Sequence, residues 1–188
     1  MKKLLMIVAM MVATLSANAQ NEVGQVTLKP MAGINLAKLT GDGNKTKVGL
    51  VAGVEAEYGV AQNFGLTFGA LYSMEGAKGE KVAGEAPKMN LDYINVPIMA
   101  NYYVIPGLAI KAGIQPGFLM SAKDNDGNSF KDEMKKVDIS IPLGASYEFE
   151  NFVIDARYNL GLTKGNKNGD KSRKNSVLMF TVGYKFAL

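Results

Sequence analysis

The sequence contains no cysteine, no histidine and no tryptophan among its 188 residues. These absences exclude disulfides, zinc sites built on His or Cys, and catalysis by a Ser-His-Asp or Cys-His pair. An enzyme would have to work with carboxylates, lysine, tyrosine or serine alone. The charge does not indicate nucleic acid either, because the formal net charge is only +4 and two of the positive charges are Lys2 and Lys3. We expect no cofactor, no metal and no nucleic-acid partner.

The beginning of the chain has the organisation of a secretory signal peptide. Lys2 and Lys3 precede an apolar run over Leu4–Leu15, and Ala17-Asn18-Ala19 forms a small-residue cleavage site. The run is shorter than the roughly 20 apolar residues that a membrane-spanning helix needs. We therefore expect residues 1–19 to be a cleaved signal peptide and residues 20–188 to form one exported domain.

The rest of the chain alternates between apolar and polar residues, a period typical of β-strands with two different faces. The alternation occurs eight times, in segments 26–36, 47–58, 64–75, 94–102, 108–121, 137–149, 152–163 and 178–188. Short connections alternate with four long polar ones, at 37–46, 77–88, 122–136 and 164–175. This pattern predicts an all-β fold, an eight-stranded antiparallel up-and-down barrel whose first strand pairs with the eighth.

Alternation alone does not say which face looks outward, and two arrangements stay open. A lipocalin-like carrier has an apolar interior, whereas an outer-membrane barrel has an apolar exterior. The polar face is rich in Gly, Ser, Thr and Asn and sparsely charged, which favours the membrane. Aromatic residues also gather near the short turns, as in an interfacial girdle. These residues are Tyr58, Phe64, Tyr102, Tyr103, Tyr147, Phe149, Phe152, Tyr184 and Phe186.

Several segments resemble the PorT-type outer-membrane β-barrel domain of the Bacteroidetes, a porin-like family of Gram-negative bacteria. They are AGINLAKLTGD (32–42), GALYSMEGAK (69–78), YINVPIMANYY (93–103), AGIQPGFLMSAKD (112–124), DARYNLGLT (155–163) and VGYKF (182–186). The resemblance implies an eight-stranded transmembrane barrel in the outer membrane with both termini in the periplasm. It supplies no catalytic residues, and its namesake is associated with secretion. Many such barrels end on an aromatic residue, whereas in this chain Ala187 and Leu188 follow Phe186.

The alternation places a set of charged residues inside the barrel. An eight-stranded barrel is only wide enough for side chains to fill it, and charges there must be paired. We expect a lumen ion-pair network that plugs the barrel, with acid/base catalysis by the carboxylates as the alternative. The set is Lys29, Glu55, Glu57, Lys111, Asp138, Glu148, Asp155, Arg157 and Lys185.

The last long connection is strongly basic. It carries Lys164, Lys167, Lys171, Arg173 and Lys174 against Asp170. On an outer-membrane barrel these cations could bind a polyanion such as lipopolysaccharide, or they could simply be solvated.

The sequence thus favours a non-enzymatic outer-membrane barrel with a structural or surface-interaction role through four long extracellular loops. A small-solute porin is the alternative, and a periplasmic lipocalin-like carrier is a second one. The expected partners are outer-membrane lipids, lipopolysaccharide and, during biogenesis, the barrel-assembly machinery.

Overall fold

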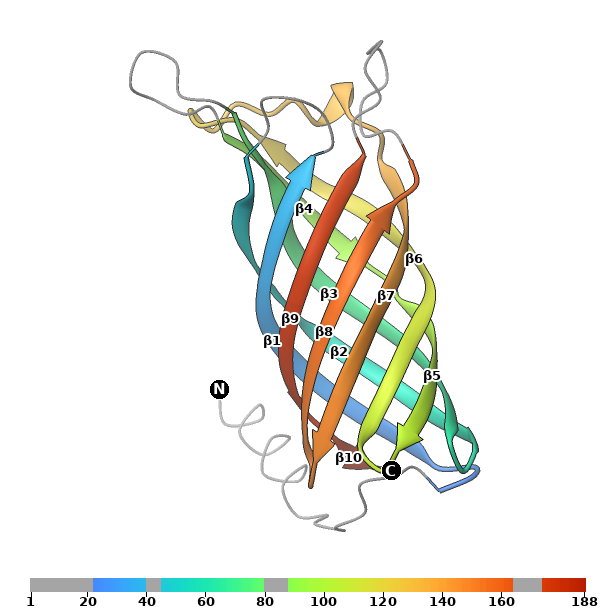
Figure 1. The fold of residues 1–188 in the computed structure, drawn as a ribbon. Helices are drawn as coiled ribbons and strands as arrows, with labels where there is room; N and C mark the ends of the chain where they lie inside the picture. Colours follow the sequence, from blue (N-terminus) through green and yellow to red (C-terminus); the bar gives the residue numbers. More distant parts are fainter. Residues whose placement is uncertain (1–21, 40–44, 80–87, 164–173) are drawn as a thin grey trace, which may run out of the picture.

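The computed structural model is a closed antiparallel β-barrel and describes residues 22–39, 45–79, 88–163 and 174–188 (Figure 1). Residues 1–19, for which we predict a signal peptide, lie outside the described residues. No helix within the described ranges is long and apolar enough to cross a membrane. The elements are β1 (Val26–Leu39), β2 (Lys47–Ala61), β3 (Phe64–Lys78), β4 (Lys88–Asn95), β5 (Ile98–Ile105), β6 (Leu108–Lys123), the 3-10 turn η1 (Lys131–Glu133), β7 (Val137–Phe149), β8 (Phe152–Gly161), β9 (Asn175–Tyr184) and β10 (Phe186–Ala187).

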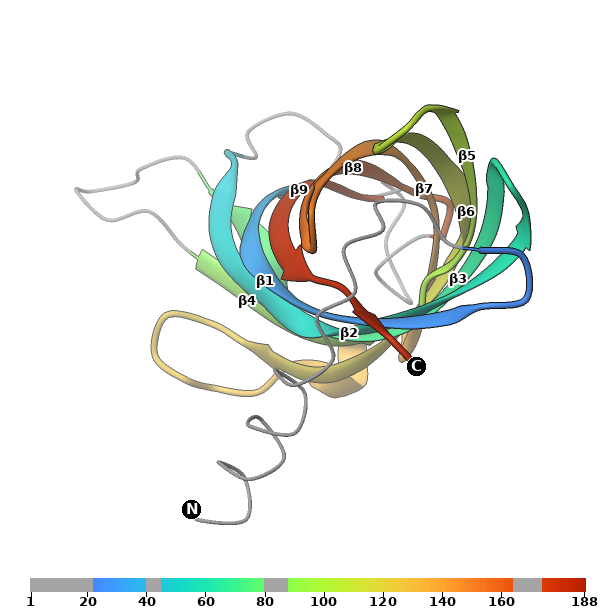
Figure 2. The same ribbon diagram turned by 90° about the horizontal axis from the view of Figure 1, so that it is seen from below.

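The ten strand segments form eight strands, because two strands are each interrupted once. β4 and β5 lie between the same neighbours in one register, since Asn95 and Ile98 both pair with β3 and β6 without a shift. β9 and β10 likewise continue one another along β1. Pairing of β1 with β9 and β10 closes the ring (Figure 2). The predicted eight-stranded up-and-down barrel is confirmed.

Prolines explain the interruptions. Pro97 lies in the gap between β4 and β5, where its carbonyl accepts a hydrogen bond from the Gly69 amide at 3.0 Å. Pro142 keeps its pairing with Asn159 on β8, while the β6–β7 ladder lapses opposite it. Pro30 pairs with Val54 on β2 and faces the gap between β9 and β10. Pro30 and Pro142 therefore open a ladder on one side only, which a closed barrel tolerates. At Pro97 the regular pairing lapses toward both β3 and β6, and the Val96 amide spans the gap to β6 by donating to the Pro116 carbonyl at 2.8 Å.

The short turns lie at the end of the barrel that also holds both described termini (Figure 1). Pro106 and Gly107 connect β5 to β6 in a tight turn. Gly107 has a φ of +84°, a backbone conformation that glycine adopts more readily than other residues. The Gly107 carbonyl accepts a hydrogen bond from the Glu148 amide at 2.7 Å, which ties this turn to the β7–β8 turn. The strand ends that the four longer connections join lie at the opposite end.

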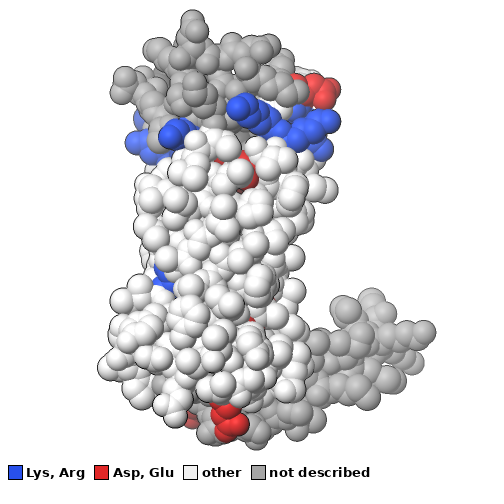
Figure 3. Space-filling view, turned by 90° about the vertical axis from the view of Figure 1, so that its right-hand side faces the viewer, with Lys and Arg blue, Asp and Glu red and all other residues white. Residues whose placement is uncertain are grey.

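The apolar face of every strand looks outward. Ile34, Leu50, Phe68, Ile114 and Val182 are all exposed on the outer surface, and their strand neighbours point into the barrel. On the face shown in Figure 3 the charged residues gather at the two ends, and the wide band between them is almost free of charge. This is the arrangement of a barrel in lipid and the inverse of a lipocalin-like carrier.

The aromatic residues at the short-turn end follow the sequence prediction with one correction. Tyr102, Tyr147 and Phe152 lie exposed on the outer surface, and the Phe152 and Tyr184 rings meet edge to face with centroids 5.1 Å apart. Tyr103 does not belong to the girdle, because its side chain is buried inside the barrel. Tyr103 directly follows the outward-facing Tyr102 on β5 and therefore lies on the inward face, where its hydroxyl contacts polar partners.

The outward apolar face makes a depth-dependent prediction. Replacement of Ile114, in the middle of β6, by Arg should lower the unfolding free energy by about 2–4 kcal/mol, because it places a charge against lipid acyl chains. Ile105 is equally apolar and exposed but ends β5 at the short turn. Ile105→Arg should therefore cost about 0–1 kcal/mol. Equilibrium urea unfolding in lipid vesicles measures both values, and equal costs would contradict the orientation.

Candidate functional site

The barrel interior is the candidate functional site, and all nine residues predicted for the lumen line it. Eight of them are buried, and Asp138 lies half-buried at the long-loop end. They do not form one continuous group. The structure separates them into a central cluster, a basal cluster near the short turns, and an upper chamber near the long loops.

The central cluster consists of Lys29, Glu55, Lys111, Asp155 and Arg157. The Arg157 guanidinium forks onto both carboxylates, at 2.5 and 2.8 Å from the Glu55 oxygens and at 2.5 and 2.8 Å from the Asp155 oxygens. Lys29 adds an ion pair to Glu55 at 2.9 Å, and Lys111 adds one to Asp155 at 2.8 Å. Every member is buried, so these charges depend on one another for compensation.

The basal cluster consists of Glu57, Tyr103, Glu148 and Lys185. The Lys185 ammonium lies 2.7 and 2.8 Å from the two Glu148 oxygens and 3.9 Å from Glu57. The Tyr103 hydroxyl lies 2.8 Å from an oxygen of each of the two carboxylates. Together the central and basal clusters contain four cations (Lys29, Lys111, Arg157, Lys185) and four carboxylates (Glu55, Glu57, Glu148, Asp155), so their charges balance.

An apolar layer of Met31, Val51, Leu71 and Met179 lies above the central cluster and is fully buried inside the barrel. On β1, for example, Met31 follows Lys29 toward the long loops. The alternation did not predict this layer, because these apolar residues interrupt the polar side of their strands. Consecutive apolar residues, which place apolar side chains on both faces of a strand, are the signal that could have predicted the apolar layer.

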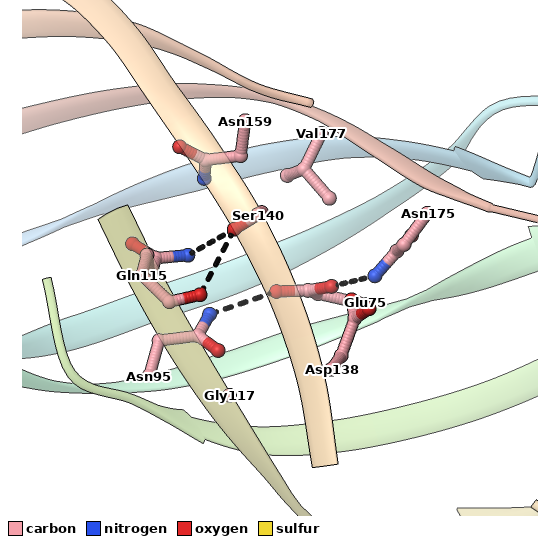
Figure 4. Close-up of a pocket in the computed structure, with 9 residues that line it drawn as sticks. All are labelled: Glu75, Asn95, Gln115, Gly117, Asp138, Ser140, Asn159, Asn175 and Val177. Atoms are coloured by element: carbon pink, nitrogen blue, oxygen red, sulfur yellow. Dashed lines mark hydrogen bonds between the residues drawn. The ribbon is translucent and has the colours of Figure 1, made fainter. Parts of the chain in front are cut away.

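The upper chamber lies above this layer and contains Glu75, a buried carboxylate that the lumen prediction omitted (Figure 4). Ser73 donates a hydrogen bond to Glu75 at 2.8 Å and Asn95 donates one at 2.9 Å. Asn175 is a third donor, and Asp138 accepts from the Thr163 hydroxyl. Continued alternation along β3 would have placed Glu75 inward, so the signal was present.

The interior offers little room for a substrate. The upper chamber holds about one water-sized occupant, and the carboxylates of the other two clusters are engaged by cations or by Tyr103. Within the described residues no group of three or more carboxylates is arranged to hold a metal ion. The geometry therefore fits a filled barrel better than acid/base catalysis.

The basic connection lies largely outside the described residues, which include only Lys174 of its five predicted cations. Lys174 is exposed directly before β9. Lys164, Lys167, Lys171 and Arg173 receive no structural account.

The sequence matches one family model over residues 18–165, and that model describes an outer membrane protein β-barrel domain. The chain belongs to this family. The outer-membrane assignment agrees with the apolar exterior and closed ring described above. A comparison with functionally curated proteins gave no match.

Solved outer-membrane barrels have the same fold. Neisserial surface protein A is 18% identical with a TM-score of 0.57, and the match covers 87% of this chain and 97% of that one. Ail, the attachment invasion locus protein of Yersinia pestis, is 18% identical with a TM-score of 0.51, covering 88% and 100%. The structure of Ail in a phospholipid bilayer nanodisc gives a TM-score of 0.52 at 19% identity, covering 87% and 99%. At these identities the likeness concerns the fold of the barrel.

The central cluster predicts a large stability loss when its fork is removed. Arg157→Ala leaves Glu55 and Asp155 buried with fewer donors, so it should lower the unfolding free energy by about 3–5 kcal/mol. Arg157→Lys retains the charge without the fork and should lose less. Urea unfolding measures both, and an Arg157→Ala barrel as stable as the wild type would contradict the role given to this network.

Proposed function

We propose that the protein is a non-enzymatic outer-membrane barrel with a structural or surface-interaction role, in which a plugged lumen supports four long extracellular loops. The observation that carries the proposal is the set of eight charge-balanced residues across the interior. Within this set, Arg157 on β8 bonds to Glu55 on β2 and to Asp155 on its own strand. A barrel closed by its own side chains supports loops rigidly and leaves no path for a solute. The small-solute porin has no comparable observation in its favour.

The surface role would belong to the long-loop end, which lies opposite the described termini. The described termini lie at the short-turn end, in keeping with the periplasmic termini that the PorT-type resemblance implies. The PorT-type assignment, the secretion role of its namesake and the signal peptide stay predictions. Lipopolysaccharide is the polyanion we propose for Lys164, Lys167, Lys171, Arg173 and Lys174, since cations at that end would meet its phosphates.

A planar-bilayer recording tests the plugged lumen. The purified barrel should insert without steady ionic current, because the central and basal clusters fill the interior. A matched recording from a known porin verifies that insertion and conduction are detectable. Reproducible single-channel steps from the wild-type protein would contradict the proposal and favour the porin.

Replacement of the five loop cations by Gln tests polyanion binding. The variant should lose most of its affinity for lipopolysaccharide, measured by a sedimentation or fluorescence assay, and wild-type binding should weaken with salt because the attraction is screened. Its unfolding free energy should stay close to that of the wild type, since none of the five cations belongs to the central or basal cluster. Unchanged binding by the five-residue variant would refute this partner.

A further inference from the structure

The upper chamber differs from the two clusters below it in its charge. The central and basal carboxylates face four cations, but the side-chain donors to Glu75 are the hydroxyl of Ser73 and the amides of Asn95 and Asn175. Asp138, in the same chamber, accepts from the Thr163 hydroxyl. The ammonium of Lys47 lies near the chamber, where it donates to the backbone carbonyl of Glu75 at 2.7 Å. Among the described residues, the side-chain donors to both carboxylates are therefore neutral.

Unsatisfied amide groups line the same chamber. Gln115 and Asn159 are each only 3% exposed, and Asn175 is 8% exposed. The Gln115 Oε1, Asn175 Oδ1 and both amide atoms of Asn159 have no hydrogen-bond partner among the protein atoms. The Gln115 side chain donates only through Nε2, to Ser140 at 3.4 Å. Buried polar atoms without partners are costly, so a small polar occupant is expected among them.

The chamber wall is shaped to leave this space open. Gly117 lies opposite Asn95, and a Cβ at that position would come within 2.4 Å of the Asn95 Oδ1. The glycine therefore lets the Asn95 amide reach Glu75 while the chamber retains room for about one water-sized occupant. An organic cation does not fit in that volume.

We propose that the upper chamber binds one calcium ion through the carboxylates of Glu75 and Asp138 and the amide oxygens of Gln115, Asn159 and Asn175. Calcium takes six to eight oxygen ligands in flexible geometry, and carboxylates with amide carbonyls are its usual donors. Magnesium retains several waters in a strict octahedron, which the small volume disfavours. A bound calcium ion neutralises these two carboxylates, whose side-chain donors within the described ranges are neutral. It also ties β3, β6, β7, β8 and β9 together at the long-loop end of the barrel.

Calcium titration of the chelator-treated, full-length barrel in micelles tests the site. Isothermal titration calorimetry should give saturable binding of one Ca²⁺ per chain, and Ca²⁺ should raise the unfolding temperature because it binds only the folded state. Mg²⁺ at the same concentration should bind more weakly. Glu75→Gln and Asp138→Asn should each weaken Ca²⁺ binding about tenfold or more, since each removes a charged ligand.

Two matched variants locate the effect. Glu57→Gln makes the same chemical change in the basal cluster, and Asp124→Asn changes a loop carboxylate that accepts hydrogen bonds from the Asp126 and Asn128 amides at 3.0 and 2.8 Å. Both should bind Ca²⁺ like the wild type. Asp138 is only half-buried, so its variant should fold even where Glu75→Gln does not, which heat-modifiable gel migration checks.

Three outcomes would overturn the proposal. The wild type could show no saturable Ca²⁺ binding at millimolar concentration, which would mean that the chamber holds water or protonated carboxyl groups instead of calcium. Binding could persist unchanged in Asp138→Asn and Glu75→Gln. It could also disappear in Asp124→Asn, which would move the site to the loop between β6 and β7.

Discussion

Closure of the sheet is the constraint on which the rest of this structure depends. A bilayer offers no water to backbone N–H and C=O groups, so a sheet can span it only when its first and last strands pair. Here β1 pairs with β9 and β10, and the Leu188 amide extends the seam by donating to the Val26 carbonyl at 2.9 Å. The gap opposite Pro30 is the one place where this seam is open, and the chain resumes the same register beyond it.

Closure with eight strands also decides what the interior can be. Such a ring is too narrow for a wide channel, so the inward side chains must fill it and satisfy one another. Arg157 does this for two strands at once, because its guanidinium bonds to Glu55 on β2 and to Asp155 on its own strand. The apolar layer around Leu71 then separates the balanced charges from the upper chamber. The interior is therefore graded along the barrel axis, and the acidic end lies beneath the long loops.

Much of this could be predicted from the sequence because period-two alternation fixes both the strands and their faces. Lys29, Glu55 and Arg157 could be placed inside for that reason, and Glu75 would have followed from the same rule. Their grouping could not be predicted, since contact between Glu55 and Arg157 depends on the stagger of distant strands. The prediction for Tyr103 was wrong because it followed the neighbouring aromatic residues. The alternation with the outward-facing Tyr102 indicates the inward face instead. The ladder gaps at Pro97 and Pro142 could not be predicted either, because they depend on the three-dimensional register of the strands.

The most direct test of the account is gel migration of the protein from isolated outer membranes of expressing cells, with and without boiling in SDS. A closed, membrane-inserted barrel resists SDS until it is heated, so the detergent-extracted protein should run as a compact band when unboiled and as a slower band after boiling. Recovery in the soluble periplasmic fraction, with one mobility under both conditions, would contradict the account. The apolar outer surface would then need a covering other than lipid.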